Sequence, residues 1–486
     1  MSELKSQTIK GVFWSFLEKF GSQFILLISQ VILARLLEPE DFGLIGMLAI
    51  FIGVSQAFID SGFDNALIQK KDVNQTDYST VFYFNIAIGF VLYFLLFAAA
   101  PYIADFFHQP LLIDLTRVVC LVLAVNSFGL IHLVKFKIEM NFKSIAQVVV
   151  IANFLSAFVG IGMALLNLGV WALAGQIIGI YFFRTVLFWI KSSWRPSFIF
   201  SIQSFKQLFR FGSKLLLSGI ISQTFENIYL MVIGRMFSAS ALGFYTQAKK
   251  LQQVPVTTLA QVVGNVTFPA FSKIQDDNEK LKQGFRKLIK LLVFINFPLM
   301  LGLAVVAKPL LVLVLGAKWL PAVPYFQLLC IAGMIYTLHA SNLNILKVKG
   351  RSDLFLYLEI VKKSIVILAI IIGLNWGIMG LVIGQICTSF ISFFINAFFT
   401  GKLIAYTIPN QLKDVSQTFL ITLLMVAFMM TGWLIDNEIL SLSYQILIGI
   451  GSYLLLAIAT KQEALTDGLL ILKEVIPLRR WKNIKY

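Results

Sequence analysis

Long apolar runs separated by short polar segments follow one another along the whole chain. A run of about 20 mostly apolar residues is the length that one α-helix needs to cross the hydrocarbon core of a bilayer. The pattern predicts fourteen such helices, over residues 12–36, 41–63, 79–100, 113–134, 145–166, 169–190, 213–236, 242–268, 288–307, 325–346, 354–374, 377–399, 415–435 and 441–460. Connections as short as 167–169 and 375–377 force the helices that they join to run antiparallel. The sequence therefore predicts an all-α polytopic membrane protein.

The amino-acid composition agrees with a membrane protein and excludes several other classes of protein. Of the 486 residues, 58% are hydrophobic and only 13% are charged. Soluble globular domains carry about twice that charged fraction, so a soluble enzyme, a disordered chain and a fibrous repeat are excluded. The three cysteines, Cys120, Cys330 and Cys387, all lie in apolar runs without a CxxC pair, and the three histidines are far apart. We therefore expect neither a disulfide framework nor a metal site.

The net charge of +16 comes from basic residues that lie between the apolar runs. Lys and Arg outside the predicted spans are concentrated in alternate connections and near both ends of the chain. The positive-inside rule places these segments in the cytoplasm, so both termini are predicted to be cytoplasmic and the number of spans even. This distribution explains the charge without a nucleic-acid partner. The first ten residues lack the features of a cleaved signal peptide, so the first span is expected to remain as an anchor.

Two parts of the chain resemble each other at an offset of 200 to about 209 residues. The matches are Ser22-Gln23 with Ser222-Gln223, 31–35 with 231–235, Gly43 with Gly243, and 167–169 with 375–377. Two copies of six helices would form parallel repeats, as in two-lobed transporters that hold the substrate between their lobes. The predicted organisation is an N-terminal lobe (1–190), an amphipathic cytoplasmic linker (191–212), a C-terminal lobe (213–400), a thirteenth and fourteenth helix (401–460) and a basic cytoplasmic tail (461–486).

Ionisable residues inside the predicted spans mark the candidate site. A charge at the centre of a bilayer costs about 2.5–3.5 kcal/mol on insertion scales, so most of these groups must reach a wet cavity, a partner or the interface. The longest polar stripe lies on the eighth span and includes Lys250, Gln253, Thr257 and Gln261 at helical spacing. The predicted cavity cations are Lys249, Lys250, Arg35, Arg235, Lys362 and Lys363, and the predicted polar or coupling residues are Glu18, Asp60, Glu226, Gln253, Thr257 and Gln261.

Several of these residues also have a plainer interpretation, in which they serve helix ends or local pairs. Glu18 would snorkel to the interface, Asp60 would be a polar helix end, and Arg184 would anchor to lipid headgroups. Arg35 and Arg235 would cap the outer ends of their helices. Lys362 and Lys363 would pair with Glu359. Glu226, Lys249 and Lys250 lie deep in their spans on polar stripes, which favours a cavity role for them.

Local sequence near the N-terminus resembles a known family. The segments that carry the resemblance are Gly11-Val12-Phe13-Trp14-Ser15, the run 33–43 (LARLLEPEDFG), Asp60-Ser61-Gly62-Phe63 and Ala66-Leu67-Ile68-Gln69. They are similar to the start of the colanic-acid, O-antigen and teichuronic-acid exporters. These are the Wzx-type oligosaccharide-lipid flippases of the polysaccharide transporter family, within the multidrug/oligosaccharidyl-lipid/polysaccharide exporter (MOP) superfamily.

This resemblance implies a fold, a cargo and a place in the cell. The fold would be the MATE-like two-lobed architecture, with an added helix pair that accommodates a lipid tail. The cargo would be an undecaprenyl-diphosphate-linked oligosaccharide, moved across the bacterial cytoplasmic membrane by alternating access for O-antigen, capsule or exopolysaccharide synthesis. The residues that would form its cationic cavity are Lys249, Lys250, Arg35 and Arg235. The polymerase and the chain-length regulator of the same pathway are the implied protein partners.

Two other functions stay open at this point. One is a multidrug or organic-cation antiporter of the same superfamily, although the deepest charges here lean basic and favour an anionic cargo. The other is a membrane polymerase or ligase that acts on the same glycan. No enzyme motif and no large loop that could hold a catalytic domain occur in the sequence. We therefore expect no catalytic residue and no cofactor beyond a coupling proton or sodium ion, with Glu226 or Asp60 as its carrier.

Overall fold

The computed structural model describes residues 2–60, 62–70 and 72–468, with the side chains of all of these except 2–10, 12, 211, 214, 260–266, 269 and 352. They form α-helices and short 3-10 helices, and no β-strand occurs in this part of the chain. The contacts divide the chain into two compact units, unit 1 (Met1–Thr246) and unit 2 (Gln247–Tyr486). The prediction of an all-α fold is confirmed.

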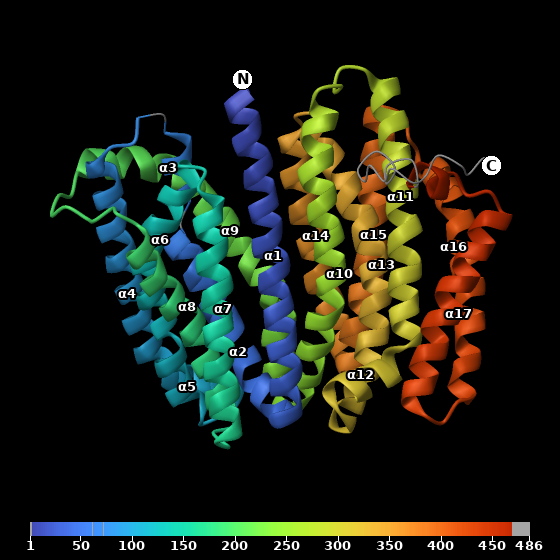
Figure 1. Ribbon diagram of the computed structural model, residues 1–486, viewed down its shortest axis with the longest axis horizontal. Coiled ribbons are helices and arrows are strands. Elements are labelled where there is room, and N and C mark those ends of the chain that lie inside the picture. The colour runs from blue at the N-terminus through green and yellow to red at the C-terminus, as the bar shows by residue number, and fades with distance from the viewer. Residues whose placement is uncertain (1, 61, 71, 469–486) are drawn as a thin grey trace. The chain divides into compact units, whose positions relative to one another are not determined.

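Unit 1 is built from long helices with short connections (Figure 1). Its helices are α1 (Ser2–Leu36), α2 (Pro39–Asp60), α3 (Phe63–Gln69), α4 (Gln75–Phe107), α5 (Leu112–Val119), α6 (Leu121–Ile138), α7 (Phe142–Leu165), α8 (Val170–Lys191), α9 (Ile202–Met236) and the start of α10 (Ala239–Ser272). The link from α7 to α8 is tight because Asn167 and Gly169 adopt positive φ angles of 59° and 54°. As the short link predicted, α7 and α8 lie against each other.

Unit 2 contains the rest of α10 and the later helices. These are α11 (Asn278–Val305), α12 (Ala307–Leu315), η1 (Ala317–Ala322), α13 (Val323–Val348), α14 (Ser352–Gly373), η2 (Leu374–Trp376), α15 (Gly377–Ile404), α16 (Ile408–Met430), η3 (Thr431–Leu434) and α17 (Glu438–Ala459). The α16 and α17 helices lie side by side, and α16 also packs along α11 (Figure 1). Pro409 stands in the first turn of α16, where its missing N–H removes no helical hydrogen bond.

Twelve segments of the described chain are long and apolar enough to cross a membrane. One of them, Asp353–Ile404, contains two α-helices, α14 and α15, separated by η2. The long helix α10 is not among the twelve, and its polar residues are those that the sequence placed on the eighth span. The predicted count of fourteen spans is therefore not confirmed, and the two six-helix copies stay a prediction. The segment predicted as an interfacial linker enters α9 at Ile202, so its helical part is continuous with the following span.

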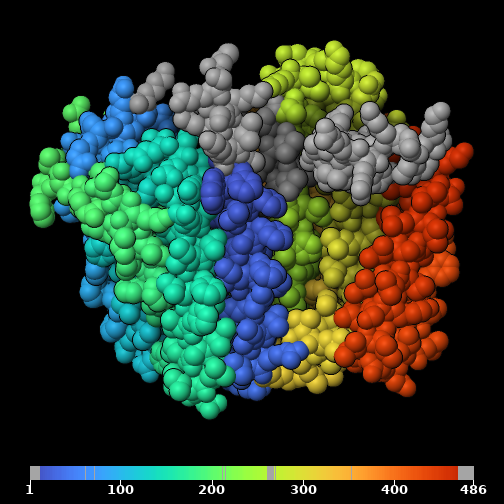
Figure 2. All heavy atoms as spheres, viewed as in Figure 1, coloured from blue at the N-terminus to red at the C-terminus, as the bar shows by residue number. Residues whose placement is uncertain are grey.

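The surface of α1 shows how these helices meet lipid. Its large apolar side chains point outward, and Phe13, Phe16, Phe20 and Phe24 are each more than half exposed. Figure 2 shows α1, in blue, at the surface of unit 1. An exposed column of phenylalanines would be unfavourable in water but is the ordinary surface of a membrane helix.

The connections predicted to be cytoplasmic meet at one end of unit 1. The link that follows α8 is tied to the start of α4, since Trp194 Nε1 donates to Gln75 Oε1 at 2.6 Å and Gln75 Nε2 donates to the Arg195 carbonyl at 2.7 Å. At the first turn of α4, the buried Asp77 carboxylate binds Lys70 at 2.7 Å and accepts from the Ser204 hydroxyl. We call this the basic end of unit 1.

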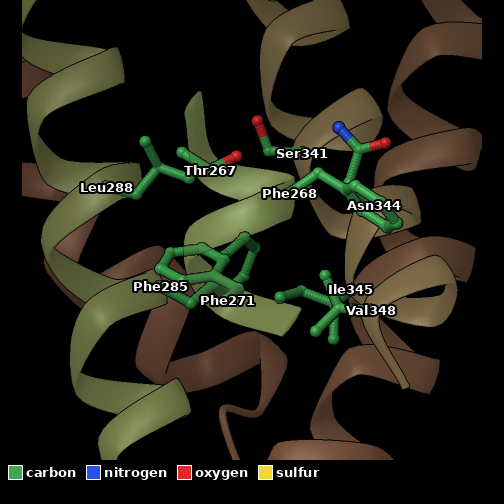
Figure 3. A pocket seen from close by; sticks show the side chains of 9 residues that line it. All are labelled: Thr267, Phe268, Phe271, Phe285, Leu288, Ser341, Asn344, Ile345 and Val348. Carbon is green, nitrogen blue, oxygen red and sulfur yellow. The ribbon is translucent and has the colours of Figure 1, made fainter. Parts of the chain in front are cut away.

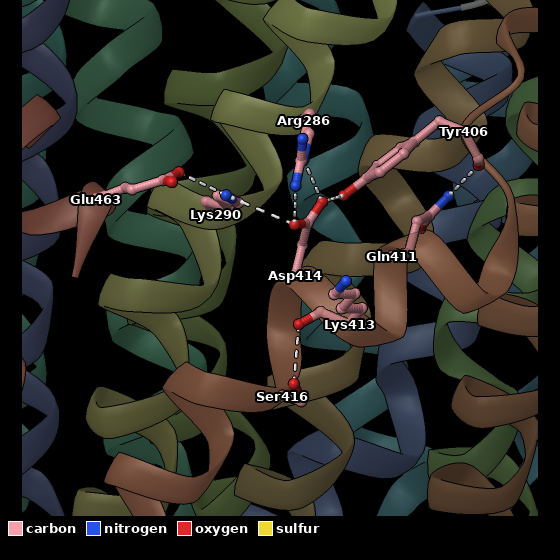
Figure 4. A network of polar contacts seen from close by, with 8 residues as sticks. All are labelled: Arg286, Lys290, Tyr406, Gln411, Lys413, Asp414, Ser416 and Glu463. Carbon is pink, nitrogen blue, oxygen red and sulfur yellow. Dashed lines mark hydrogen bonds and ion pairs between the residues drawn. The ribbon is translucent and has the colours of Figure 1, made fainter. Parts of the chain in front are cut away.

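Unit 2 has a corresponding basic end, shown in Figure 4. Asp414 of α16 is nearly buried and accepts two hydrogen bonds from Arg286 of α11, each 2.6 Å long. The Tyr406 hydroxyl donates to the same carboxylate at 2.8 Å, and Lys290 bridges Asp414 and Glu463 at 3.5 and 2.6 Å. This network joins α11 to the start of α16 and to the segment after α17. In both units, segments predicted to share one side of the membrane therefore lie together.

Candidate functional site

Four ionisable side chains from four helices gather inside unit 1. They are Glu18 of α1, Asp60 of α2, Lys137 of α6 and Arg184 of α8, and all four are half-buried. The charges of Lys137 and Arg184 both act on Glu18 and on Asp60. We call these four residues the unit 1 charge cluster. It contains two acids and two bases. The charge of Lys19 also acts on Glu18 and that of Asp64 on Asp60, so the acids and bases acting there remain equal in number.

Arg184 is held in this cluster by directed contacts. Its guanidinium donates to Asn126 Oδ1 of α6 and lies 4.8 Å from the ring centroid of Tyr181. Asp60 in turn accepts a hydrogen bond from Gln56 Nε2 at 3.0 Å. The prediction that Arg184 anchors to headgroups is wrong, because the side chain turns toward α6 and the acids of α1 and α2 rather than toward lipid. The sequence showed a charge inside a span but could not show that Asn126, 58 residues earlier, would receive it.

The polar face of α10 carries the central candidates of the site. Lys250 is exposed and forms no hydrogen bond or ion pair within the residues that the structure describes. Lys249 and Gln253 are half-buried, and Thr257 is exposed, with its hydroxyl donating to the Gln253 carbonyl at 2.8 Å. The side chain of Gln261 lies outside the described residues. A face with an unpartnered ammonium cannot rest in hydrocarbon and requires water, ligand or protein beside it.

The helix α14 carries the other predicted cations. Lys362 forms an ion pair with Glu359 one turn earlier, and the side chain of Lys362 is only 11% exposed. Its charge acts on His339 of α13, whose ring meets the Tyr336 ring edge to face, with the ring centroids 4.9 Å apart. Lys363 is half-buried beside it. The structure thus shows the Glu359 pair that the plainer interpretation predicted for Lys362, while a role in binding cargo stays a prediction for both lysines.

The remaining candidates lie apart from these groups. Arg35 is exposed in the last turn of α1. Arg235, in the last turn of α9, contacts the His108 ring at the end of α4 and lies 5.2 Å from the centroid of the Phe106 ring. These contacts hold Arg235 at a helix end. Glu226 is exposed on α9. The structure therefore brings Glu18 and Asp60 together, but it does not join the two arginines to the unit 1 charge cluster.

One pair of helix starts in unit 1 meets through two glycines. A Cβ atom on Gly43 of α2 would lie 1.8 Å from the Ala239 carbonyl oxygen, and one on Gly243 of α10 would lie 1.8 Å from the Pro39 carbonyl oxygen. Both positions therefore require glycine. The two contacts are reciprocal, because adding 200 to each residue number of Pro39 and Gly43 gives Ala239 and Gly243, as a two-fold axis between repeated segments would produce. Gly43 and Gly243 are also a pair that the offset in the sequence singled out.

Inside unit 2, the last described side chains of α10 line one small cavity. Figure 3 shows Thr267, Phe268 and Phe271 of α10 facing side chains of α11 and α13 around a cavity of about 10 Å³. That volume holds about one water molecule. The cavity is part of the packing between these helices and has no room for a sugar or a phosphate. Among the described residues, no group of three or more His, Cys, Asp and Glu side chains is arranged to hold a metal ion.

Comparison with known sequences gives one family and several named relatives. Residues 32–324 match the model of a family described as polysaccharide biosynthesis protein. The lipopolysaccharide biosynthesis protein WzxC of Escherichia coli is 30% identical over 403 residues, which are 81% of either chain. The teichuronic acid biosynthesis protein TuaB of Bacillus subtilis is 28% identical over 74% of either chain. The succinoglycan biosynthesis transport protein ExoT of Rhizobium meliloti is 26% identical over 73% of this chain and 72% of its own.

Among solved structures, the fold is similar to the lipid II flippase MurJ in an inward closed conformation. The TM-score is 0.74, and the match covers 93% of this chain and 99% of the MurJ chain at 19% sequence identity. At that identity the likeness concerns the fold. It extends into the terminal helices α16 and α17, because nearly all of both chains is matched.

Proposed function

Since the chain belongs to the polysaccharide biosynthesis protein family, we propose that it moves an undecaprenyl-diphosphate-linked oligosaccharide from the inner to the outer leaflet of a bacterial cytoplasmic membrane. The single observation that carries this proposal is the match to WzxC over 81% of both chains. The relative ExoT is named as a transport protein, and the fold is similar to that of a lipid II flippase. The exported glycan would serve O-antigen, capsule or exopolysaccharide synthesis.

The chemistry of the cargo sets what the protein must supply. A diphosphate carries about two negative charges, which cannot cross hydrocarbon without compensation. The exposed ammonium of Lys250, which lacks a protein partner among the described residues, is suited to bind such an anion. Neighbouring amide and hydroxyl groups, those of Gln253 and Thr257, suit the hydroxyls of the attached sugar. The polyprenyl chain would stay in the bilayer throughout the transfer.

Coupling to an ion gradient is the second part of the proposal. The charges of Arg184 and Lys137 act on the carboxylates of Asp60 and Glu18, so a change in the charge of either acid would unbalance the unit 1 charge cluster. We place the coupling proton or sodium ion at Asp60, with Glu226 as the second candidate. Flipping in proteoliposomes that is independent of both pH and sodium would contradict this part alone.

Alternating access requires a contact that opens and closes. The reciprocal contact at Gly43 and Gly243 is suited to this role because it joins two helix starts without side chains between them. We expect Gly43→Ala to lower export per molecule of membrane-inserted protein, since its methyl group would force the Ala239 carbonyl to move. Gly162→Ala is the matched control, because no described atom lies within 4 Å of the added methyl group. If the two variants export equally well, the contact between Gly43 and Gly243 has no role in the transport cycle.

The function itself is tested by deleting the gene and locating lipid-linked repeat units. If the protein is a flippase, we expect complete units to accumulate on the cytoplasmic leaflet of the deletion strain. A plasmid copy of the gene should then reverse this accumulation. Units that accumulate unpolymerised on the outer leaflet would identify a polymerase or ligase instead. Normal glycan together with raised drug sensitivity would identify a multidrug antiporter. Either of the last two results would overturn the proposal.

A further inference from the structure

A second cavity lies in unit 2 at the end of α11 opposite to the basic end. Arg286 and Val305 are both on α11 and are 19 residues apart, which corresponds to roughly 28 Å along a helix. The cavity beside Val305 has a volume of about 400 Å³, within the range of about 300–1,000 Å³ that is common for ligand pockets. None of the predicted site residues with described side chains lines it. We call it the Trp433 pocket.

Apolar side chains form most of the wall of the Trp433 pocket. They come from α12, η1, α13 and the turn before α17, and they include Pro309, Leu320, Pro324 and Ile435. Trp433 of η3 is 53% exposed, so much of its indole is available to a ligand. The indole N–H donates to the Val305 carbonyl at 3.2 Å, which fixes the orientation of the ring. A fixed aromatic face with negative π density attracts the slightly positive C–H groups of a ligand.

The polar groups of the Trp433 pocket balance one another. Lys308 of α12 and Glu438 of α17 form an ion pair at 3.2 Å. Gln327 of α13 donates its Nε2 to the Ala304 carbonyl at 3.1 Å, and the Ser441 hydroxyl donates to the Gly432 carbonyl at 2.8 Å. The ion pair offers donors and acceptors side by side, while its net charge is zero. Such an arrangement suits a neutral ligand with several hydroxyl groups.

Other ligands fit these walls less well. A phosphate would compete with Glu438 for Lys308, and no second cation is among the described residues that line the pocket. A lipid acyl chain would leave the Lys308–Glu438 pair desolvated beside hydrocarbon, which is costly. A sugar ring satisfies both parts of the wall, since its C–H face can stack on Trp433 while its hydroxyls reach the ion pair.

We propose that the Trp433 pocket binds one or two sugar rings, at a site separate from Lys250 and the unit 1 charge cluster. That the sugar is part of the exported glycan rests on the proposed function, because the end of unit 2 opposite to the basic end would then face the outside. The pocket would hold the oligosaccharide as it leaves the transport site. Binding of a sugar as such depends only on the chemistry of the wall.

The test uses the full chain in lipid nanodiscs, because maltoside detergents carry the sugar that is being tested. Saturation-transfer NMR is recorded with lactose, cellobiose and N,N′-diacetylchitobiose at millimolar concentration. We expect transfer from the wild-type protein to at least one of these disaccharides, and a reduction of fivefold or more in Trp433→Ala and in Glu438→Gln. Trp376→Ala is the matched control and should keep the wild-type signal, since Trp376 is 69% exposed on η2 and lies outside the pocket.

The outcomes separate this inference from the proposed function. Absence of transfer to all three disaccharides, or equal transfer in the wild type and in both pocket variants, would overturn the inference. Glu438→Gln keeps the side-chain shape, so it tests the pocket even where Trp433→Ala fails to fold. The purified chain could bind sugar while deletion of its gene leaves the lipid-linked units in their normal leaflet. That combination would support the sugar site and contradict the flippase function. If no sugar binds but the lipid-linked units accumulate on the cytoplasmic leaflet, the sugar site is contradicted and the flippase function is supported.

Discussion

The two units carry their interior charge differently. In the unit 1 charge cluster, two acids lie beside two bases, and Arg184 is further held by Asn126 and Tyr181. Within the predicted spans of α10 and α14 in unit 2, four lysines at 249, 250, 362 and 363 accompany one acid, Glu359. A balanced cluster holds helices together and responds to one added proton or ion. A surplus of positive charge instead requires an anion, and this difference favours a coupling role for unit 1 and cargo binding by unit 2.

The largest effect is expected from removing Arg184. Arg184→Ala would remove the charge-assisted hydrogen bond to Asn126 and the strongest positive charge that acts on Asp60, and losing a hydrogen bond of a charged group costs about 1.5–3 kcal/mol. The free energy of unfolding should fall by that order, measured by thermal unfolding of the purified protein. The double variant Arg184→Ala with Asp60→Asn should recover the part of the loss that comes from the charge of Asp60. If the single variant is as stable as the wild type, the cluster does not hold unit 1 together.

A smaller effect is expected from Lys250, and on export rather than on stability. Under the proposed function, Lys250→Ala would remove a charge-assisted hydrogen bond to the cargo, and such a bond is worth about 1.5–3 kcal/mol, or roughly 10- to 150-fold in affinity. Export should fall accordingly at unchanged protein level, measured as surface glycan in complemented deletion cells. Lys413→Ala is the control, since Lys413 is exposed at the basic end of unit 2. Wild-type export by the Lys250 variant would remove this lysine from the mechanism.

The basic end of unit 2 provides a comparison with its counterpart in unit 1. Asp414 joins α16 to α11 through Arg286, Lys290 and Tyr406. Because Arg286 is half exposed, Asp414→Ala should lower the free energy of unfolding by only about 1–3 kcal/mol. Asp77→Ala in unit 1, where the carboxylate also caps α4, should cost a similar amount. Thermal unfolding measures both, and a loss confined to one of them would show that the two basic ends are not equivalent.

The smallest effect is expected from Glu463, after α17. Its hydrogen bond with Lys290 lowers the pKa of the carboxyl below the usual range. A lowered pKa in the folded state stabilises the protein above the unfolded-state pKa of about 4.3, and this contribution disappears as the pH falls through the folded-state pKa. Glu463→Gln should therefore cost about 0.2–1 kcal/mol at neutral pH. The difference from the wild type should vanish in acid, and a difference that persists there would exclude this ion pair as its cause.

The sequence predicted the fold class because apolar runs report burial in lipid directly. It also indicated which connections share a side of the membrane, and those connections do lie together at the basic ends. It could not indicate which helices are neighbours, since periodicity describes one helix at a time. The contacts of Arg184 with Asn126 and of Asp414 with Arg286 join residues 58 and 128 positions apart, and no local pattern marks such pairs. The Trp433 pocket was missed for the same reason, because its wall comes from several connecting segments.

The most direct test of the central claim is flipping by the purified chain. Undecaprenyl-diphosphate-linked oligosaccharide is placed in both leaflets of proteoliposomes, and an impermeant glycosidase then acts from outside. We expect the cleaved fraction to rise from about half toward completion with the wild-type chain, and to stay near half with Lys250→Ala or without protein. Cleavage that stops near half with the wild-type chain, under every tested pH and sodium gradient, would contradict the claim that this protein moves the lipid-linked glycan.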